Sequence, residues 1–211
     1  MSATFRLCVL ASGAGTNLQA IIDRLHSRPA ERGPQIEVCG VASDKPEAGA
    51  LERARKVGIE VAVFPAEGHT DRDARDGAMA DWIEARGTDL VVLGGYMRLL
   101  SPPFVARFQQ RIVNVHPALL PSFPGLDAVG QALDHGARVT GVTVHFVDEG
   151  VDSGPIIAQR AVPVPPDRDR SALEEEIHRV EHALYPEAIR MIAEGRVRID
   201  ERNARLVLID E

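Results

Sequence analysis

Short apolar runs alternate with helical patterns through the first half of the chain. The runs at residues 5–11, 36–43, 61–64 and 90–93 have the length of buried strands, and each is followed by a helical pattern or a helix start. Strands that alternate with helices predict a parallel, doubly wound sheet. Such a sheet buries both of its faces, which explains why the apolar runs are unbroken.

The second half of the chain has a different pattern. Residues 139–147 alternate between two faces, residues 155–162 form another apolar run, and a turn rich in carboxylates and glycine lies between them. This pattern favours an antiparallel hairpin added to the parallel sheet. The predicted fold is therefore α/β, with a doubly wound, mostly parallel, Rossmann-like sheet in the N-terminal half and antiparallel strands added in the C-terminal half.

A long helix and a terminal hairpin are predicted after that. Residues 171–194 have helical spacing, and Ser171 with Glu174 three residues later has the spacing of a capping box. Pro186 is expected to bend or restart this helix, because proline lacks the N–H that the helix needs. Two short apolar runs near the C-terminus predict the hairpin.

Length, charge and cysteine content narrow the class of protein. A chain of 211 residues is long enough for one large domain, and we see no repeat or low-complexity tract. The net charge of −7 and the lack of a basic run argue against a nucleic-acid or membrane partner. The apolar run Leu7–Ala11 is too short for a signal peptide or a membrane span, so we expect a cytoplasmic protein. Cys8 and Cys39 have no second Cys or His at metal spacing, which favours buried, reduced thiols.

A glycine loop, residues 12–17, joins the first predicted strand to the first predicted helix. The N–H groups at a helix start form an anion site, so we expect a phosphate monoester here. The loop is not a dinucleotide fingerprint, because Leu18 stands where the third glycine would be, and no Walker lysine follows. The alternative is a tight turn in which Thr16 or Asn17 is the N-cap of the helix.

The segment Gly94–Pro102 follows the fourth predicted strand and is apolar where an exposed loop is expected. Its apolar residues include Met97, Leu99 and Leu100. Core packing explains part of this pattern. A flat apolar ligand that lies along the segment and bonds its backbone would explain the rest.

Asn114 and His116 lie two residues apart at the end of an apolar run, so on a strand their side chains share a face. Ligands bind at this end of the strands in open α/β sheets. Alone, the pair would favour a polar strand end with a capping Asn. Asp152 adds to the pair, because Gly154-Pro155 would hold it at a rigid turn beside a neighbouring strand.

Five motifs occur in order along the chain: residues 11–19, residues 95–102, residues 114–121, residues 145–157 with Asp152-x-Gly154-Pro155, and Glu181-His182-x-x-Tyr185-Pro186. With these motifs the chain resembles the phosphoribosylglycinamide formyltransferases, a folate-dependent family of purine synthesis, from about Leu7 to Arg198. The resemblance implies a single formyltransferase domain over residues 1–211, with a nucleotide-phosphate half at about 1–110 and a catalytic and folate-side half at about 111–211. It leaves open whether the protein is a monomer or a homodimer.

The resemblance also implies an activity: a formyl group passes from the co-substrate 10-formyltetrahydrofolate to the amine of glycinamide ribonucleotide, without a metal. Residues that match the family's motifs then take its roles, as follows: Asn114, His116 and Asp152 are catalytic; Gly15, Thr16, Asn17 and Glu181 bind glycinamide ribonucleotide; Arg72, Met97, Arg98, Leu99, Leu100 and Asn114 bind folate; and His145 is a possible neighbour of the catalytic residues. Two positions depart from the pattern and leave the detail of the pocket open. Asp127 stands where many members have His, and His178 where some have Lys near the phosphate.

The chemistry of the reaction suits these residue types independently. An amine that attacks a formyl carbon makes a tetrahedral oxyanion, which needs hydrogen-bond donors fixed in place beforehand. Asn114 is a neutral donor, and His116 is a charged one if Asp152 favours its cationic form. Asp152, through a water, could carry the proton from the attacking amine to the leaving folate nitrogen.

Three other functions remain open on the sequence. A deformylase that hydrolyses the same folate would share the Asn, His and Asp, but usually carries an extra N-terminal regulatory domain. A methionyl-tRNA formyltransferase would add a C-terminal domain and a basic surface. A non-catalytic nucleotide-binding module would keep the glycine loop without needing the three catalytic side chains.

Overall fold

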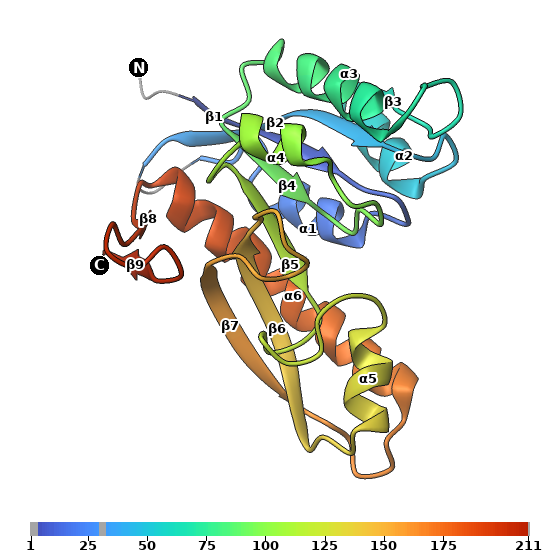
Figure 1. The fold of residues 1–211 in the computed structure, drawn as a ribbon, viewed down its shortest axis with the longest axis vertical. Helices are drawn as coiled ribbons and strands as arrows, with labels where there is room; N and C mark the ends of the chain where they lie inside the picture. The colour runs from blue at the N-terminus through green and yellow to red at the C-terminus, as the bar shows by residue number, and fades with distance from the viewer. Residues whose placement is uncertain (1–3, 30–32, 211) are drawn as a thin grey trace. The chain divides into compact units, whose positions relative to one another are not determined.

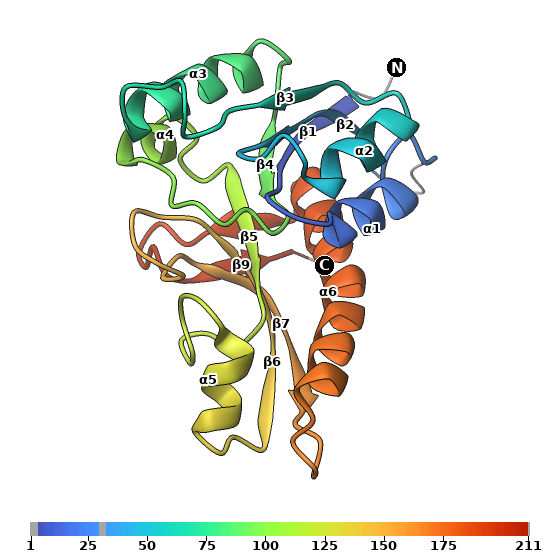
Figure 2. The same cartoon turned by 90° about the vertical axis from the view of Figure 1, so that its right-hand side faces the viewer.

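The computed structural model describes residues 4–29 and 33–210 (Figures 1 and 2). The chain divides into two compact units, Met1–Val113 and Asn114–Glu211. The strand order of its main sheet is β3-β2-β1-β4-β5-β6-β7. The prediction of a single formyltransferase domain over residues 1–211 stays a prediction.

The first unit has the alternation of strands and helices that the apolar runs predict. Its elements are β1 (Thr4–Leu10), α1 (Thr16–Arg24), β2 (Gln35–Ser43), α2 (Gly49–Lys56), β3 (Val61–Val63), α3 (Arg72–Glu84), β4 (Leu90–Leu93) and α4 (Pro102–Arg107). β1 pairs in parallel with both β2 and β4, and β2 pairs in parallel with β3. All four residues of β4 are buried, as expected of a central strand in a parallel sheet covered by helices.

The second unit contains the antiparallel part. Its elements are β5 (Ile112–His116), which begins two residues before the unit does, α5 (Ala128–Asp134), β6 (Val139–Phe146), β7 (Ile156–Pro163), α6 (Arg170–Ala193), β8 (Val197–Ile199) and β9 (Val207–Ile209). β6 and β7 pair antiparallel, and so do β8 and β9. The predicted α/β fold, mostly parallel with an added antiparallel hairpin, is therefore confirmed, and so is the terminal hairpin.

Helix starts were predicted less well than strands. α1 begins at Thr16 with Gly15 as its N-cap, and no side chain caps it, so the alternative that Thr16 or Asn17 is the N-cap is wrong. The helical pattern in the sequence predicts a start at Ala74, but α3 begins at Arg72, because Asp71 Oδ1 accepts a hydrogen bond from Ala74 N at 2.8 Å.

The capping box predicted for α6 is also wrong. The N-cap is Asp169, whose Oδ1 accepts hydrogen bonds from Ser171 N at 2.8 Å and Ala172 N at 3.2 Å. Glu174 instead accepts a hydrogen bond from Arg170 Nε at 2.7 Å. The helix also continues through Pro186 without restarting. The buried face around Pro186 favours the continuous helix and offsets the backbone hydrogen bond that proline cannot make.

Among residues 4–29 and 33–210, no helix combines the length and the apolar character that a membrane crossing requires.

The structure predicts that replacing Gly15 destabilises the first unit. Its φ of +73° is left-handed, and a Cβ atom there would lie 2.6 Å from Ala50 Cα and 2.7 Å from Ala50 Cβ in α2. Left-handed backbone costs a residue with a Cβ roughly 1–2 kcal/mol, and overpacking adds roughly 1–3 kcal/mol. We therefore expect Gly15→Ala to lower the free energy of unfolding by roughly 2–5 kcal/mol, measured by denaturant titration.

Gly13 is the matched control in the same loop. It has no positive φ, and nothing lies within 4 Å of a Cβ built there. Gly13→Ala should leave the denaturation midpoint close to that of the parent. Equal stability of the two variants would contradict the close approach of α2 to Gly15.

Candidate active site

The end of β5 presents two polar side chains on one face. Asn114 is half-buried and His116 is only 4% exposed. The two residues alternate with buried Val113 and Val115, so the period of the strand places them on the same side. Pro117 follows directly, and the strand ends there because proline has no N–H for the ladder.

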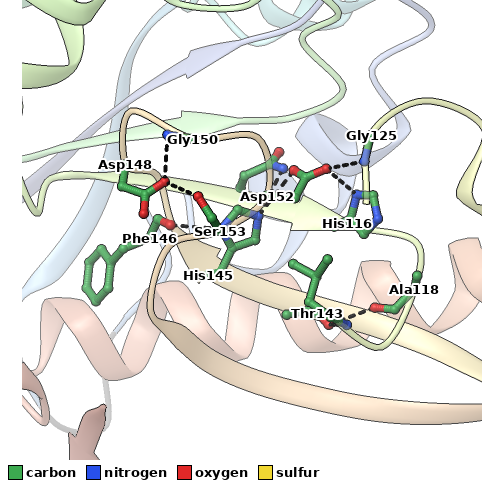
Figure 3. Close-up of polar contacts among 12 residues, drawn as sticks. His116, Ala118, Gly125, Thr143, His145, Phe146, Asp148, Gly150, Asp152 and Ser153 are labelled. Atoms are coloured by element: carbon green, nitrogen blue, oxygen red, sulfur yellow. Dashed lines mark hydrogen bonds and ion pairs between the residues drawn. The ribbon is translucent and has the colours of Figure 1, made fainter. Parts of the chain in front are cut away.

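Asp152 meets this pair from the loop between β6 and β7 (Figure 3). Its Oδ2 accepts a hydrogen bond from Gly125 N at 2.8 Å and lies 3.3 Å from His116 Nδ1. Its Oδ1 lies 3.7 Å from His145 Nε2. Asp152 is therefore a bridge between the loop after β5 and the loop after β6, and not a solvated turn residue.

The turn that carries Asp152 is held in one conformation. Asp148 Oδ1 accepts hydrogen bonds from Gly150 N at 3.0 Å and from Ser153 Oγ at 2.7 Å (Figure 3). Gly154 has no room for a side chain, because its Cβ would lie 1.9 Å from Phe146 O. Acidic side chains in turns are usually solvated, but the Asp148 carboxylate instead ties this turn together.

Both ring nitrogens of His116 face oxygen acceptors. Nε2 lies 2.8 Å from Phe123 O, and Nδ1 faces the Asp152 carboxylate. A carbonyl oxygen and a carboxylate can only accept, so a ring that carries hydrogens on both nitrogens satisfies both contacts. These two contacts hold the ring of His116 in one orientation.

His145 on β6 needs a hydrogen on only one of its ring nitrogens. Its Nδ1 lies 2.8 Å from Phe146 O and must donate there (Figure 3). Its Nε2 lies 3.3 Å from Asn114 Nδ2. Burial lowers the pKa of His145 below its ordinary value, although Phe146 O and Asp152 act against this shift. The neutral ring then accepts at Nε2, which turns the amide nitrogen of Asn114 toward it and fixes the orientation of that side chain.

Thr143 fixes the chain that follows His116, a role that sequence patterns do not indicate. Its hydroxyl donates to Ala118 O at 2.7 Å and accepts from Leu120 N at 3.0 Å (Figure 3). Because Thr143 lies on β6, these bonds tie the segment after β5 to the neighbouring strand.

The other predicted residues of the second unit lie on α6 and at the start of α5. Glu181 is on α6 and is 5% exposed. His178 stacks on His182, and both line a cavity of about 460 Å³ along α6, together with Ser171, Glu174, Glu175 and Arg179. Asp127 is the N-cap of α5, and its carboxylate bonds Gly130 N at 3.2 Å and Arg170 Nη2 at 2.7 Å. These bonds give Asp127 a structural role.

In the first unit, the glycine loop and the apolar segment lie side by side. Ser12 N donates to Gly95 O at 3.0 Å, and Met97 N donates to Ser12 Oγ at 2.9 Å. Met97 and Leu99 are 65% and 63% exposed, so core packing does not explain their apolar character. Arg98 donates to Asp44, Leu100 is half-buried, and Arg72 is the first residue of α3.

Two of these contacts involve residues that sequence patterns did not single out. Asp44 follows the end of β2 and Ser12 lies inside the glycine loop, so a polar residue at either place is ordinary in a sequence. Within residues 4–29 and 33–210, no group of three or more His, Cys, Asp or Glu is arranged to hold a metal ion.

Comparison with known proteins places the chain in a family. The formyl transferase family matches residues 5–189. The phosphoribosylglycinamide formyltransferase of Bacillus subtilis (strain 168) is 38% identical over 187 residues, which are 89% of this chain and 94% of that protein. The trifunctional purine biosynthetic protein adenosine-3 of Drosophila melanogaster is 44% identical over 190 residues, 90% of this chain, but the chain spans only 14% of that relative's length.

Solved structures agree with the sequence relatives. The crystal structure of glycinamide ribonucleotide transformylase 1 from Symbiobacterium toebii is 46% identical, with a TM-score of 0.90, and the match covers 99% of this chain and 95% of that one. The chain therefore belongs to the formyl transferase family and, within it, to the phosphoribosylglycinamide formyltransferases.

Proposed function

We propose that this chain transfers the formyl group of 10-formyltetrahydrofolate to the amine of glycinamide ribonucleotide. The products are formylglycinamide ribonucleotide and tetrahydrofolate. The observation that carries the proposal is the cluster of Asn114, His116 and Asp152 in the second unit, in a chain whose relatives have this activity in their names. Both substrates are small molecules, and the proposed chemistry requires no metal.

Asn114 and His116 stabilise the oxyanion in this proposal. The amide nitrogen of Asn114 carries two hydrogens, one of which is directed at His145 Nε2. The second is the donor for the oxyanion that forms when the amine attacks the formyl carbon. The positive charge of His116, held by Phe123 O and Asp152, stabilises the same negative charge in a site that needs little reorganisation.

Asp152 moves the proton that the reaction releases. The attacking amine loses one proton, and the leaving folate nitrogen gains one. A carboxylate that accepts the proton through a water and returns it to the folate nitrogen balances the step. The Oδ2 of Asp152 is engaged by Gly125 N and His116, so its Oδ1 is the oxygen that serves the water.

The substrates are assigned to the segments that suit their chemistry. The glycine loop with Gly15, Thr16 and Asn17 offers N–H groups at the start of α1 for the phosphate, and Glu181 meets the ribosyl-amine part of the nucleotide. The folate lies along Met97, Arg98, Leu99 and Leu100, with Arg72 on its side and Asn114 at the formyl group. The exposed apolar side chains of Met97 and Leu99 support this assignment.

One assay tests the activity and separates it from the main alternatives. The protein is mixed with 10-formyltetrahydrofolate, and folate absorbance is followed with and without glycinamide ribonucleotide. We expect turnover only when the nucleotide is present. The same rate of turnover with and without the nucleotide would mean a deformylase. No turnover under either condition would mean a non-catalytic binding module.

Loss of either oxyanion group should lower kcat with little change in KM, because both groups act mainly in the transition state. One such donor typically contributes roughly 2.7–4 kcal/mol, so we expect Asn114→Ala and His116→Ala each to lower kcat by about 10²–10³-fold. Steady-state kinetics with both substrates varied measures the effect.

The double variant provides the internal control for that assignment. Asn114 and His116 act on one charge, so Asn114→Ala/His116→Ala should lose less than the product of the single losses. A strictly multiplicative loss would show that the two residues act on separate steps.

The folate assignment is tested on an exposed apolar residue. Leu99→Asp places a charge where the folate would lie, and we expect it to abolish tetrahydrofolate binding in calorimetry while glycinamide ribonucleotide still binds. Leu206, which is 46% exposed in the β8–β9 hairpin, gives the matched control. Leu206→Asp should leave the affinity for both ligands at the parent level. Loss of nucleotide binding alone in Leu99→Asp would reverse the assignment of the two substrates.

A further inference from the structure

Asp44 is a buried carboxylate beside the two predicted binding segments of the first unit. It directly follows β2, and the residue is only 5% exposed. Its Oδ2 accepts a hydrogen bond from Arg98 Nε at 3.0 Å, and the guanidinium of Arg98 is half-exposed. A buried carboxylate is costly unless it is paired and hydrogen-bonded, so this contact fixes the side chain of Arg98 in place.

Ser12 connects the glycine loop to the segment that carries Arg98. Its Oγ accepts the hydrogen bond from Met97 N, while its own N–H donates to Gly95 O. The hydroxyl of Ser12 still has a hydrogen to donate. Burial raises the pKa of Asp44, but hydrogen bonding, including that from the Arg98 side chain, and the charge of Arg98 outweigh burial and hold that pKa below its ordinary value.

The far end of the apolar segment is held by a different carboxylate. Asp76 Oδ2 accepts a hydrogen bond from Ser101 N at 2.7 Å, and its Oδ1 pairs with Arg75 Nη2 at 2.7 Å. Both residues are buried in α3. Asp76 therefore anchors the start of α4, whereas Asp44 and Ser12 lie where the segment meets the glycine loop.

We propose that Asp44 and Ser12 are positioning residues that join the glycine loop to the segment Gly95–Arg98, so that the binding of a phosphate at one and of a pterin at the other are coupled. The contacts that connect the glycine loop to this segment do not depend on the proposed function. The identity of the two ligands does rest on the proposed function. A ligand that orders the glycine loop fixes Ser12 Oγ, which fixes the direction of the Met97 N–H. Coupling of this kind is reciprocal, so each ligand improves the affinity for the other by the same factor.

The connection between the glycine loop and this segment is tested without any ligand. Amide hydrogen exchange at Met97, followed by NMR, reports the bond from its N–H to Ser12 Oγ. We expect Ser12→Ala to speed exchange at Met97 by roughly tenfold, the effect of losing one hydrogen bond. Asp44→Asn should speed it by a smaller factor, because Asp44 acts on the segment through Arg98. Exchange at the parent rate in both variants would overturn the proposal.

Ser43→Ala is the matched control variant. Ser43 is buried beside Asp44, and its Oγ likewise accepts one backbone hydrogen bond, from Lys45 N at 3.0 Å. Its loss removes the same chemical group from the same part of the chain without touching either binding segment. Exchange at Met97 should therefore stay at the parent rate in Ser43→Ala, and a rise equal to that of Ser12→Ala would mean a general loosening.

The coupling is tested by calorimetry on the full chain. The Kd for tetrahydrofolate is measured with and without saturating glycinamide ribonucleotide. We expect the nucleotide to tighten folate binding by about fivefold or more in the parent and in Ser43→Ala, and by less than twofold in Ser12→Ala and Asp44→Asn. The kcat at saturation should change far less than the Kd values.

The outcomes separate this inference from the proposed function. A parent protein that binds neither ligand would contradict the function, while hydrogen exchange at Met97 would still decide whether the join exists. A parent that binds both ligands, with a coupling that survives Ser12→Ala and Asp44→Asn unchanged, would overturn the inference and leave the function standing.

Discussion

The contact of the Asp152 carboxylate with Gly125 N and His116 is the interaction on which the candidate site depends. It joins two loops that leave different strands, and it exists only because the turn before β7 is fixed. A Cβ on Gly154 would collide with Phe146 O, and Asp148 ties Gly150 to Ser153 inside the same turn. A buried imidazole without that carboxylate would lose the partner of one ring nitrogen, so the geometry of the turn and the hydrogen bonding of His116 are linked.

Most of the fold could be predicted because burial determines it. Apolar runs predicted β1, β2, β4 and the β6–β7 hairpin within one or two residues, since a strand buried on both faces has little freedom in composition. Helix starts were harder. Asp169 caps α6 in place of Ser171 because its backbone is extended where the chain enters the helix, and neighbouring polar residues give no sign of that difference.

The candidate site was only partly predictable from the sequence. Strand periodicity predicted that Asn114 and His116 share one face. Gly154-Pro155 predicted that Asp152 is held at a rigid turn. One partner of His116 is the carbonyl of Phe123, and the N–H of Gly125 holds the Asp152 carboxylate that faces the other ring nitrogen. Every residue has such backbone groups, so sequence patterns do not single them out. Asp44 and Ser12 were missed because each is ordinary in its own loop, and their importance arises from a contact between segments far apart in the sequence.

Two histidines in one cluster serve different purposes because their partners differ. His116 faces two acceptors and His145 faces one acceptor and one donor, so the first is satisfied with two hydrogens and the second with one. Burial lowers the pKa of His145, which keeps its ring neutral at pH 7 and keeps the nitrogen of Asn114 turned toward it. A lowered folded-state pKa means that the unfolded chain binds a proton first as pH falls, so this arrangement is most stable above the ordinary pKa of histidine and weakens below it. The cluster therefore places the amide of Asn114 and the imidazole of His116 on one face of β5, and the proposed function assigns both groups to the developing oxyanion.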